Sequence, residues 1–325
     1  MRIFLTGGAG FIGSHICREL LKEGDEIVIH DAFLNYISPF KSNYEHLLKL
    51  RFRGIVDKVK IIRGDIRHKG RFLKILKGEK PDVVVQLAAL PIATASNLYS
   101  EDAMGINLNG TVNILESLRE VDSVKKFIYT SSSMIYGNFE YSPADEKHLT
   151  NPIDVYGGTK LAGEILTNVF SKQYGINYII IRPSAVYGPT DVNRRVTQIF
   201  VENALQKKPL ILHNGGETKL DFSFVEDVAR GFVLAIKNDK VKNETFNITR
   251  GEGRSLKELA NIIKQHIPDV EIIEKEVPKN EKRPERGALD ISKAKKMLGF
   301  NPKYTLEEGM KIYIDFAKKN NIVLK

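Results

Sequence analysis

The sequence predicts an α/β fold, with a doubly wound parallel sheet followed by a smaller C-terminal lobe. Short apolar segments alternate with helical patterns through the first half of the 325-residue chain. Many of these segments are β-branched, which is typical of strands buried on both faces of a parallel sheet. A glycine-rich turn directly follows the first segment, and the character of the sequence changes after Pro183, where glycine and proline become frequent. We therefore expect the sheet in the first half of the chain and the lobe after it.

Six strands are expected in the first half, separated by helices. Their apolar runs lie at 2–5, 26–30, 59–62, 82–87, 126–130 and 177–181. The intervening segments show apolar residues at helical spacing, as in 111–120, where Val112, Leu115 and Leu118 share one side. An apolar content of 42% permits a full core for such a sheet.

The turn after the first strand predicts a dinucleotide site. The free N–H groups and the positive end of the following helix point at this turn, where they favour a diphosphate. Its glycines allow a tight turn and a close approach of the ligand. The expected cofactor contacts are Gly7, Gly10, Phe11, Ile12 and Gly13.

Asp31 indicates which dinucleotide binds. It ends the second strand, 18 residues beyond Gly13, near the spacing at which a carboxylate accepts hydrogen bonds from the adenosine ribose. A carboxylate repels a 2′-phosphate, and no Arg or Lys follows before Lys41, so NAD is favoured over NADP. Asp65 and Ile66 follow the third strand and are expected near the adenine, with an ordinary strand-ending turn as the alternative.

Later segments indicate that the chain returns to the sheet. Further helices are predicted at 197–206, 221–237 and 255–266, and a further strand at 245–248. We predict that residues 1–183 form a Rossmann-type NAD-binding domain, which 221–248 rejoins. The substrate-binding lobe would consist of residues 184–220 and 249–325. A cleft between the two, at the carboxyl ends of the strands, would hold the substrate.

Composition argues against several classes of function. The net charge of +9 lies in interrupted clusters without a nucleic-acid-binding motif, so no nucleic-acid partner is expected. No apolar run approaches the roughly 18 residues that span a membrane, and the first strand begins at residue 2 without a signal peptide. The single cysteine, Cys17, fits a reducing compartment, and we expect a cytoplasmic protein. The seven histidines are scattered, so no metal is expected.

Tyr156 and Lys160 are the strongest catalytic candidates. Four positions apart on a helix, they share one face. A nearby ammonium and the cationic nicotinamide ring both lower the pKa of a phenol, which suits Tyr156 to acid–base work near neutral pH. A serine cluster that includes Ser132 and Ser133 follows the fifth strand, where a hydroxyl can bond the reacting substrate oxygen. A polar turn is the alternative for this cluster.

Together these motifs resemble those of the extended short-chain dehydrogenases/reductases that act on nucleotide sugars. UDP-glucose and UDP-galactose 4-epimerases are the most similar subfamily, and the resemblance covers nearly the whole chain. Asn107 matches the structural asparagine of the family, and Leu87, Ala88 and Ala89 match its strand beside the nicotinamide ribose. The other matching segments are 181–189, 224–228, 283–284, 290–294 and 298–300.

The resemblance implies a role for each catalytic candidate. Ser132 would be the catalytic hydroxyl, Tyr156 the base, and Lys160 both the group that lowers the pKa of Tyr156 and a ribose anchor. Tyrosinate would remove the proton from sugar O4 while hydride passes from C4 to NAD, giving a 4-keto sugar. The family also commonly forms homodimers through helices near 104–120 and 156–172, and we expect one here.

Ser133 and Met134 distinguish between the subfamilies. Dehydratases of the family place Asp-Glu directly after the catalytic hydroxyl, and decarboxylases place a Glu two residues before the Tyr of Tyr-Gly. Here those positions hold Ser133 and Met134, which are not general acids or bases at neutral pH. The simplest outcome is rotation of the keto sugar and return of hydride to its other face. The sequence therefore favours 4-epimerisation.

Three residues depart from the family's pattern and affect substrate binding. Ala185, Leu220 and Gln86 stand where the family often has Asn, Arg and His. The family's Asn and Arg contact the diphosphate, so these two contacts are missing at Ala185 and Leu220. Other cations of this chain can pair with the phosphate oxygens instead. For Arg194 and Arg195 the alternative is a surface loop without a binding role. The expected substrate contacts are Arg194, Arg195, Lys219 and Arg283, together with Ser132, Ser133 and Tyr156.

Three alternative functions stay open. A nucleotide-sugar dehydratase and a net NAD(P)-dependent oxidoreductase share the fold, and the oxidoreductase must exchange its cofactor in each cycle. A non-catalytic dinucleotide-sensing protein is the alternative of another class, since this architecture supports many functions. Such a protein could lose Tyr156 or Lys160, whereas this chain has both.

Overall fold

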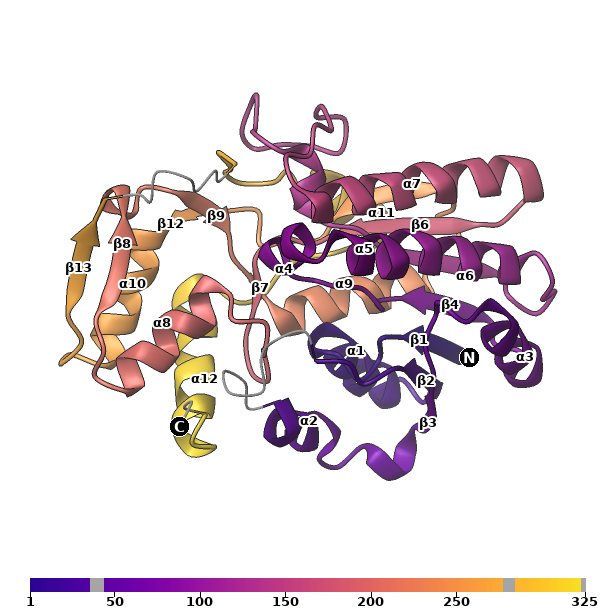
Figure 1. Ribbon diagram of the computed structural model, residues 1–325, viewed down its shortest axis with the longest axis horizontal. Coiled ribbons are helices and arrows are strands. Elements are labelled where there is room, and N and C mark those ends of the chain that lie inside the picture. The colour runs from indigo at the N-terminus through magenta and orange to yellow at the C-terminus, as the bar shows by residue number, and fades with distance from the viewer. Residues whose placement is uncertain (36–43, 277–283, 323–325) are drawn as a thin grey trace.

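A seven-stranded parallel sheet forms the centre of the computed structural model, which describes residues 1–35, 44–276 and 284–322 (Figure 1). The strands lie in the order β11-β6-β5-β4-β1-β2-β3. They are β1 (Arg2–Thr6), β2 (Glu26–Asp31), β3 (Lys60–Arg63), β4 (Val83–Gln86), β5 (Lys126–Thr130), β6 (Tyr178–Arg182) and β11 (Glu244–Asn247). The strand order reverses between β1 and β4, and ligands bind at such a switch point. The predicted fold class is confirmed.

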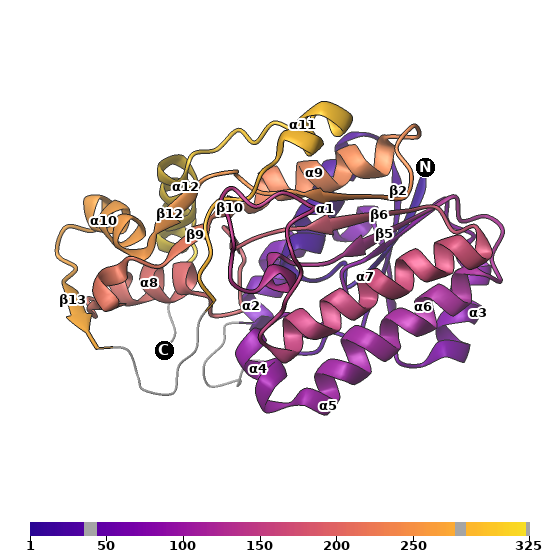
Figure 2. The ribbon, with the colours of Figure 1, turned by 90° about the horizontal axis from the view of Figure 1, so that it is seen from above.

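Helices cover both faces of the sheet, as Figure 2 shows. Side chains alternate along each strand, so Ile3 and Leu5 pack into one core while Phe4 packs into the other. The first core is shared with α1 (Phe11–Lys22), α9 (Val225–Lys237) and α11 (Ser292–Leu298). The second is shared with α3 (Lys69–Glu79), α6 (Gly110–Leu118) and α7 (Val155–Tyr174). The apolar strands that the sequence displays are therefore buried on both sides.

The C-terminal lobe has a hydrophobic core of its own, which includes Phe200, Leu212, Leu259 and Met310. Its helices are α8 (Val196–Leu205), α10 (Leu256–His266) and α12 (Leu306–Lys319). Three two-stranded pairs complete it: β7 (Val186–Tyr187) with β10 (Ser223–Phe224), β9 (Lys219–Asp221) with β12 (Gly253–Ser255), and β8 (Leu210–His213) with β13 (Ile272–Lys275). The remaining helices, on the sheet side, are α2 (Tyr44–Phe52), α4 (Ala93–Leu98) and α5 (Ser100–Ala103).

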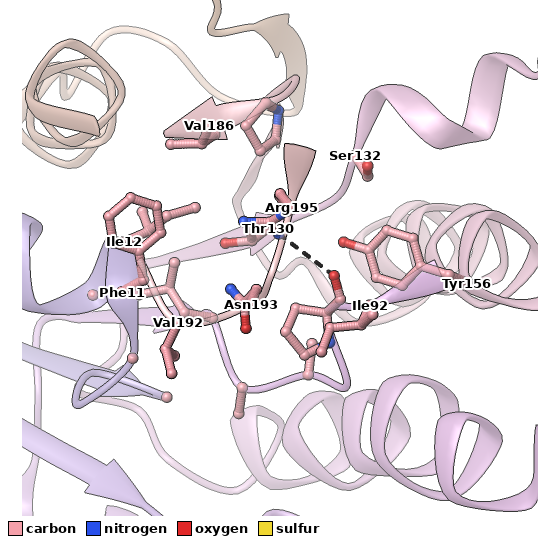
Figure 3. Close-up of a pocket in the computed structure, with 18 of the residues that line it drawn as sticks. Phe11, Ile12, Ile92, Thr130, Ser132, Tyr156, Val186, Val192, Asn193 and Arg195 are labelled. Atoms are coloured by element: carbon pink, nitrogen blue, oxygen red, sulfur yellow. Dashed lines mark hydrogen bonds between the residues drawn. The ribbon is translucent and has the colours of Figure 1, made fainter. Parts of the chain in front are cut away.

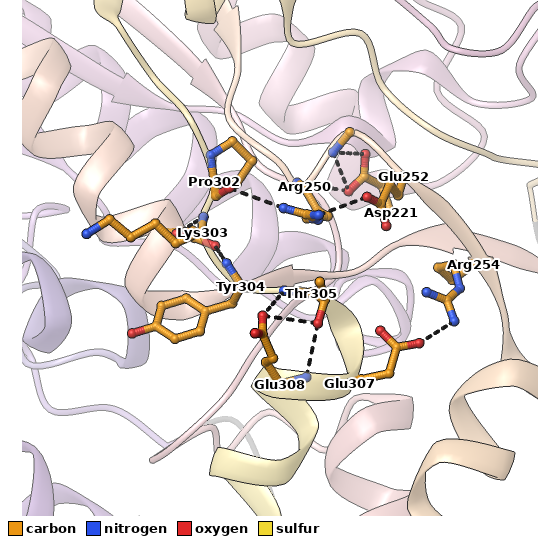
Figure 4. Close-up of polar contacts among 12 residues, drawn as sticks. Asp221, Arg250, Glu252, Arg254, Pro302, Lys303, Tyr304, Thr305, Glu307 and Glu308 are labelled. Carbon is orange, nitrogen blue, oxygen red and sulfur yellow. Dashed lines mark hydrogen bonds and ion pairs between the residues drawn. The ribbon is translucent and has the colours of Figure 1, made fainter.

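Buried polar contacts hold the segments where the lobe meets the sheet (Figure 4). The carboxylate of Asp221 accepts hydrogen bonds from the Thr249 hydroxyl at 3.0 Å, the Gly251 N–H at 3.1 Å and the Leu289 N–H at 3.1 Å. A buried carboxylate is stable only when its oxygens are satisfied in this way. Asp221, on β9, thus holds two other segments, around Thr249 and at Leu289, at the edge of the lobe.

Two predicted elements differ from the structure. The helix expected at 221–237 begins only at Val225, because Asp221 ends β9 and Ser223 begins β10. The helix expected at 111–120 spans Gly110–Leu118 and continues from a π-helical turn, Met104–Asn109. The predicted strand 245–248 is present as β11, which pairs with β6. Among the described residues, no helix has both the length and the apolarity needed to cross a bilayer.

Candidate active site

A pocket of about 480 Å³ follows the carboxyl ends of the sheet strands and reaches the lobe. Its walls come from the turn after β1, the ends of β2 to β5, the start of α7 and the loop before α8. Nearly all the predicted site residues line it: Gly7, Gly10, Phe11, Ile12, Gly13, Asp31, Asp65, Ile66, Leu87, Ala88, Ala89, Ser132, Ser133, Tyr156, Lys160, Arg194 and Arg195. The structure therefore brings these residues together, while their individual roles stay predictions.

The glycine-rich turn has no room for side chains. Gly7 has a φ of +72°, and a Cβ atom on it would collide with the backbone nitrogen of Ala88. A Cβ on Gly13 would lie 2.7 Å from the carbonyl oxygen of Gly7. The backbone at the N-terminus of α1 therefore approaches the pocket without obstruction, which suits a diphosphate. The residues present fit NAD at this position.

Asp31 is held in place beside this turn. Its two carboxylate oxygens accept hydrogen bonds from the Ala9 N–H at 3.0 Å and the Phe33 N–H at 2.7 Å. Burial raises the pKa of Asp31, and the two N–H donors together with the charge of Arg51 oppose that rise. Each carboxylate oxygen can accept more than one bond, so the group can also receive ribose hydroxyls.

Asp65 lies where the pocket reaches the end of β3. It accepts hydrogen bonds from the backbone and the side chain of Arg67. Burial raises the pKa of its carboxyl, but the bonds from Arg67 outweigh that effect and the pKa is lowered. The carboxylate is therefore ionised at neutral pH and can accept further hydrogen bonds.

Tyr156 and Lys160 lie on the first turns of α7, where Lys160 is buried and Tyr156 is half-buried. The Lys160 ammonium donates to the Thr130 carbonyl oxygen at 2.8 Å and lies 5.8 Å from the centre of the Tyr156 ring. Burial raises the pKa of Tyr156, while the charge of Arg195 and a hydrogen bond with Ser132 lower it. Burial also lowers the pKa of Lys160 to about 8.

Local hydrogen bonds orient these catalytic candidates. The Asp154 carboxylate caps α7 by accepting the Gly157 N–H at 2.7 Å. The Ser132 hydroxyl accepts the Met134 N–H at 3.2 Å at the start of a 3₁₀ turn. The buried Asn107 amide donates to the Thr159 hydroxyl at 3.1 Å and accepts the N–H of Leu90. Asn107 thereby joins α7 to the loop that follows β4.

The predicted substrate contacts have different environments. Arg195 donates to the Pro91 carbonyl oxygen at 3.4 Å and lies 3.8 Å from Asp191 (Figure 3). The figure shows its guanidinium and the Tyr156 phenol directed toward the same part of the pocket. Arg194 lines the same wall but pairs with Glu202 at 2.7 Å.

The other predicted substrate residues lie elsewhere or face other groups. The Ser133 hydroxyl donates to the Ser184 hydroxyl at 3.0 Å. Lys219, on β9, has an exposed side chain and is not among the residues that line the pocket. Arg283 lies outside the described residues.

Sequence reasoning missed two arginines that line the pocket, Arg51 and Arg286. Arg51 lies on α2, and its Nη atoms donate to the carbonyl oxygens of Ala9 and Thr190 at 3.1 and 2.8 Å. Arg286 approaches the Met134 sulfur at 3.2 Å. These contacts join residues far apart in the sequence, so no local motif marks them. The signal that could have singled out Arg286 is its position shortly after the Arg-Pro pair at 283–284.

Comparisons with known proteins agree with this geometry. The family described as "NAD dependent epimerase/dehydratase" matches residues 3–249. A Methanocaldococcus jannaschii protein named "Putative UDP-glucose 4-epimerase" is 35% identical, over 98% of this chain and 99% of the relative. The solved UDP-glucuronic acid 4-epimerase of Bacillus cereus, in complex with UDP-glucuronic acid and NAD, is 29% identical, with a TM-score of 0.89 and coverage of 98% and 99%. A human dTDP-D-glucose 4,6-dehydratase is 29% identical over 98% of this chain and 90% of its own length.

Proposed function

Because the chain belongs to the NAD-dependent epimerase/dehydratase family, we propose that it is a nucleotide-sugar 4-epimerase that regenerates its NAD in each cycle. In this proposal residues 1–183 and 221–248 hold the cofactor. The lobe, formed by 184–220 and 249–325, holds the nucleotide sugar. Bound NAD would supply the acceptor, and then the donor, for the hydride of sugar C4.

The proposed proton transfer belongs to Tyr156. Its phenolate accepts the proton of the C4 hydroxyl, while the Ser132 hydroxyl holds the same oxygen by a hydrogen bond. The Lys160 ammonium, 5.8 Å from the Tyr156 ring centre, stabilises the phenolate. On return, Tyr156 gives the proton back to O4. The glycine-rich turn, Asp31, Asp65 and the 87–89 segment are the proposed cofactor contacts.

One observation carries the choice of epimerisation over elimination. Of the described residues that line the pocket, only Asp31 and Asp65 are carboxylates, and both follow the strands on the far side of the switch point from Tyr156. Dehydration needs an acid and a base besides Tyr156, to expel water and to remove a second proton. The residues beside Ser132 are Ser133, bonded to Ser184, and the thioether Met134. The 4-keto sugar therefore has only one favoured fate, which is reduction on its other face.

The proposal is tested by incubating the purified protein, without added cofactor, with UDP-, dTDP-, GDP- and CDP-linked sugars and reading the products by NMR. We expect a C4-inverted nucleotide sugar and no net formation of NADH. A 4-keto-6-deoxy product would identify a dehydratase instead. Accumulation of NADH or a strict need for fresh NAD in each turnover would identify a net oxidoreductase. An absence of turnover with bound NAD would favour a dinucleotide-sensing protein.

We also propose that the protein is a homodimer joined through α7 and the neighbouring helices. Ile165 and Val169, four positions apart on α7, are 57% and 50% exposed, and Leu98 on α4 is 72% exposed. Large apolar side chains grouped on packed helices are typical of an interface. α4, α5 and α6 all contact α7, and Figure 2 shows α4 to α7 on the same side of the molecule.

The dimer is tested by sedimentation of the double variant Ile165→Glu/Val169→Glu. We expect a monomer, because two buried carboxylates at an interface cost more than the contact contributes. Val56→Glu changes an apolar residue of the same 50% exposure away from these helices and should leave the mass unchanged. A wild-type monomer at micromolar concentration would contradict the proposal.

A cytoplasmic location, proposed from the lone buried cysteine Cys17, is tested by fractionation.

A further inference from the structure

The proposed reaction leaves one cation of the pocket without a task. Arg286 lines the pocket and is partly buried, and its Nε atom is fully enclosed without a hydrogen-bond partner in the described structure. Its Nη1 approaches the Met134 sulfur at 3.2 Å, which is a weak acceptor. This guanidinium therefore has no strong acceptor among the described residues.

Among the described residues, Arg286 has no counter-ion to compensate its charge. Among the described residues none makes an ion pair with it; the nearest acid to influence it is Asp154, whose Oδ1 instead caps α7 by accepting the Gly157 N–H. Burial lowers the pKa of Arg286 to about 10, so the group is charged at neutral pH. Enclosing part of a charged group without a hydrogen-bond partner is unfavourable in general. The arrangement becomes favourable when a bound ligand supplies the missing anion.

The backbone holds Arg286 in a fixed position. The Glu285 carbonyl oxygen accepts the Phe139 N–H at 2.8 Å, and the Ala288 carbonyl oxygen accepts the Ala144 N–H at 3.0 Å. These bonds attach the segment that carries Arg286 to the loop that follows Tyr136. The guanidinium is therefore presented to the pocket by a constrained backbone, as a preorganised binding group requires.

Arg286 lies at the reacting end of the pocket rather than at the adenosine end. Its contact, Met134, is two residues after the proposed catalytic Ser132, and its electrostatic neighbour, Asp154, is two residues before Tyr156. The pocket's carboxylates among the described lining residues, Asp31 and Asp65, are on the other side of the switch point. This end of the pocket is therefore cationic.

The geometry of a pyranose indicates what an anion here would be. C1, which bears the diphosphate, and C4, which reacts at Tyr156, are at opposite ends of the sugar ring. A group next to the C4 site consequently faces the substituents of C3 or C5. Resting on the 4-epimerase function proposed above, we propose that Arg286 binds a carboxylate at C5, so that the substrate is a nucleotide-activated uronic acid.

The test compares matched substrate pairs with two variants. Wild-type protein, Arg286→Met and Arg286→Lys are assayed by NMR with UDP-glucuronic acid and UDP-glucose, and then with the corresponding dTDP- and GDP-linked pairs. Arg230→Met, the same change at an exposed position of α9, is the control. We expect the wild type to prefer a uronate, and Arg286→Met to lower kcat/KM for that uronate by about 10- to 100-fold, the loss of a charge-assisted bond. The value for the neutral sugar should change little, and Lys should restore part of the loss.

Thermal unfolding without ligand gives an independent measurement. Because the Nε atom of Arg286 is enclosed without a partner in the described structure, Arg286→Met should unfold at the same or a higher temperature than the wild type. Addition of the preferred uronate should stabilise the wild type and not this variant. A structural role would instead lower the unfolding temperature of the variant in the absence of any ligand.

The outcomes separate this inference from the proposed function. A C4-inverted uronate supports both, and a decarboxylated pentose product supports the substrate class while contradicting the epimerase. Equal losses for uronate and neutral sugar in Arg286→Met would mean that Arg286 binds the diphosphate, and would overturn the inference. A wild-type preference for the neutral member of every pair would also overturn it, with the epimerase intact.

Discussion

Tyr156 carries the proposed chemistry in surroundings that oppose its ionisation. Burial raises the pKa of its phenol, and the charge of Arg195 and the hydrogen bond with Ser132 act against that rise. Lys160 is charged below a pKa of about 8 and lies on the same helix face. The nicotinamide ring adds a further positive charge when NAD is bound. The activity proposed for Tyr156 therefore depends on several cations acting together.

This balance predicts the pH dependence of Lys160→Met. In the wild type kcat/KM should rise with pH as Tyr156 loses its proton. Without the ammonium the phenolate is less stable, so the pKa of Tyr156 rises and the whole profile moves to higher pH by about one unit or more. The measurement is kcat/KM between pH 6 and 10 at saturating NAD, with Lys172→Met, near the end of α7, as control. An unshifted profile would assign Lys160 to ribose binding alone.

We expect His30 to make folding sensitive to acid. Its ring is buried between Phe4 and Phe72, and neither ring nitrogen has a hydrogen-bond partner in the described part of the chain. Burial lowers the pKa of His30 to about 4 from 6.5. Since the unfolded chain binds the proton first, we expect the contribution of His30 to stability to be complete above about pH 6.5 and to be lost as the pH falls toward 4.

We expect this histidine to remove up to about 3 kcal/mol of unfolding free energy between pH 7.5 and pH 4. His30→Leu should show a smaller loss over the same range, whatever its absolute stability. Urea unfolding at several pH values measures this difference. His266→Leu, at the end of α10, is the control and should retain the wild-type slope. A slope unchanged by His30→Leu would assign the acid sensitivity to other groups.

At the scale of elements, α2 acts through one buried arginine. Arg51 is 2% exposed and connects the glycine-rich turn at Ala9 with Thr190, the loop that enters the lobe. Arg18 on α1 donates to three carbonyl oxygens at the end of α2, which fixes the position of Arg51. Burial lowers the pKa of Arg51 to about 10, and Tyr44, Asp191 and Asp31 oppose that fall. One side chain thus joins both walls of the pocket.

Arg51→Met should therefore weaken NAD binding by about 10- to 100-fold, because two charge-assisted bonds to the turn and the loop are lost. Arg51→Lys should recover only part of this affinity, since an ammonium cannot reproduce the forked geometry. Titration calorimetry measures the dissociation constant of NAD for each variant. Arg53→Met, an exposed arginine just beyond α2, is the matched control. Equal affinity for NAD in Arg51→Met and in the control would contradict this role of Arg51.

Some elements could be predicted from the sequence because their signals are local. The glycine turn, the buried strands and the Tyr156–Lys160 pair each lie within a few residues, and the structure contains all of them. The predicted start of α9 was wrong because Asp221 is held by partners 28 to 68 residues away in the sequence. A helical pattern of a few residues does not contain such contacts. Arg51 and Arg286 were missed because their partners lie 139 and 152 positions away. Only the folded chain reveals such contacts.

On the scale of the whole molecule, the pocket lies between the sheet and the C-terminal lobe. The sheet and its helices build the wall that faces the cofactor, and the lobe, with its own core, builds the other wall. The proposed catalytic groups on α7 and after β5 face cations from the lobe and from the segment of Arg286. Family membership fixes the nucleotide-sugar chemistry, and the arrangement of charges in this pocket favours inversion without elimination.

The central claim is that one hydride leaves sugar C4 and returns to the same carbon without leaving the site. It is tested most directly with a nucleotide sugar deuterated at C4, incubated with the purified protein in ordinary water and analysed by NMR. The account predicts a C4-inverted product that retains its deuterium, with no free reduced cofactor. Loss of the deuterium to solvent, or its appearance in released cofactor, would contradict the account.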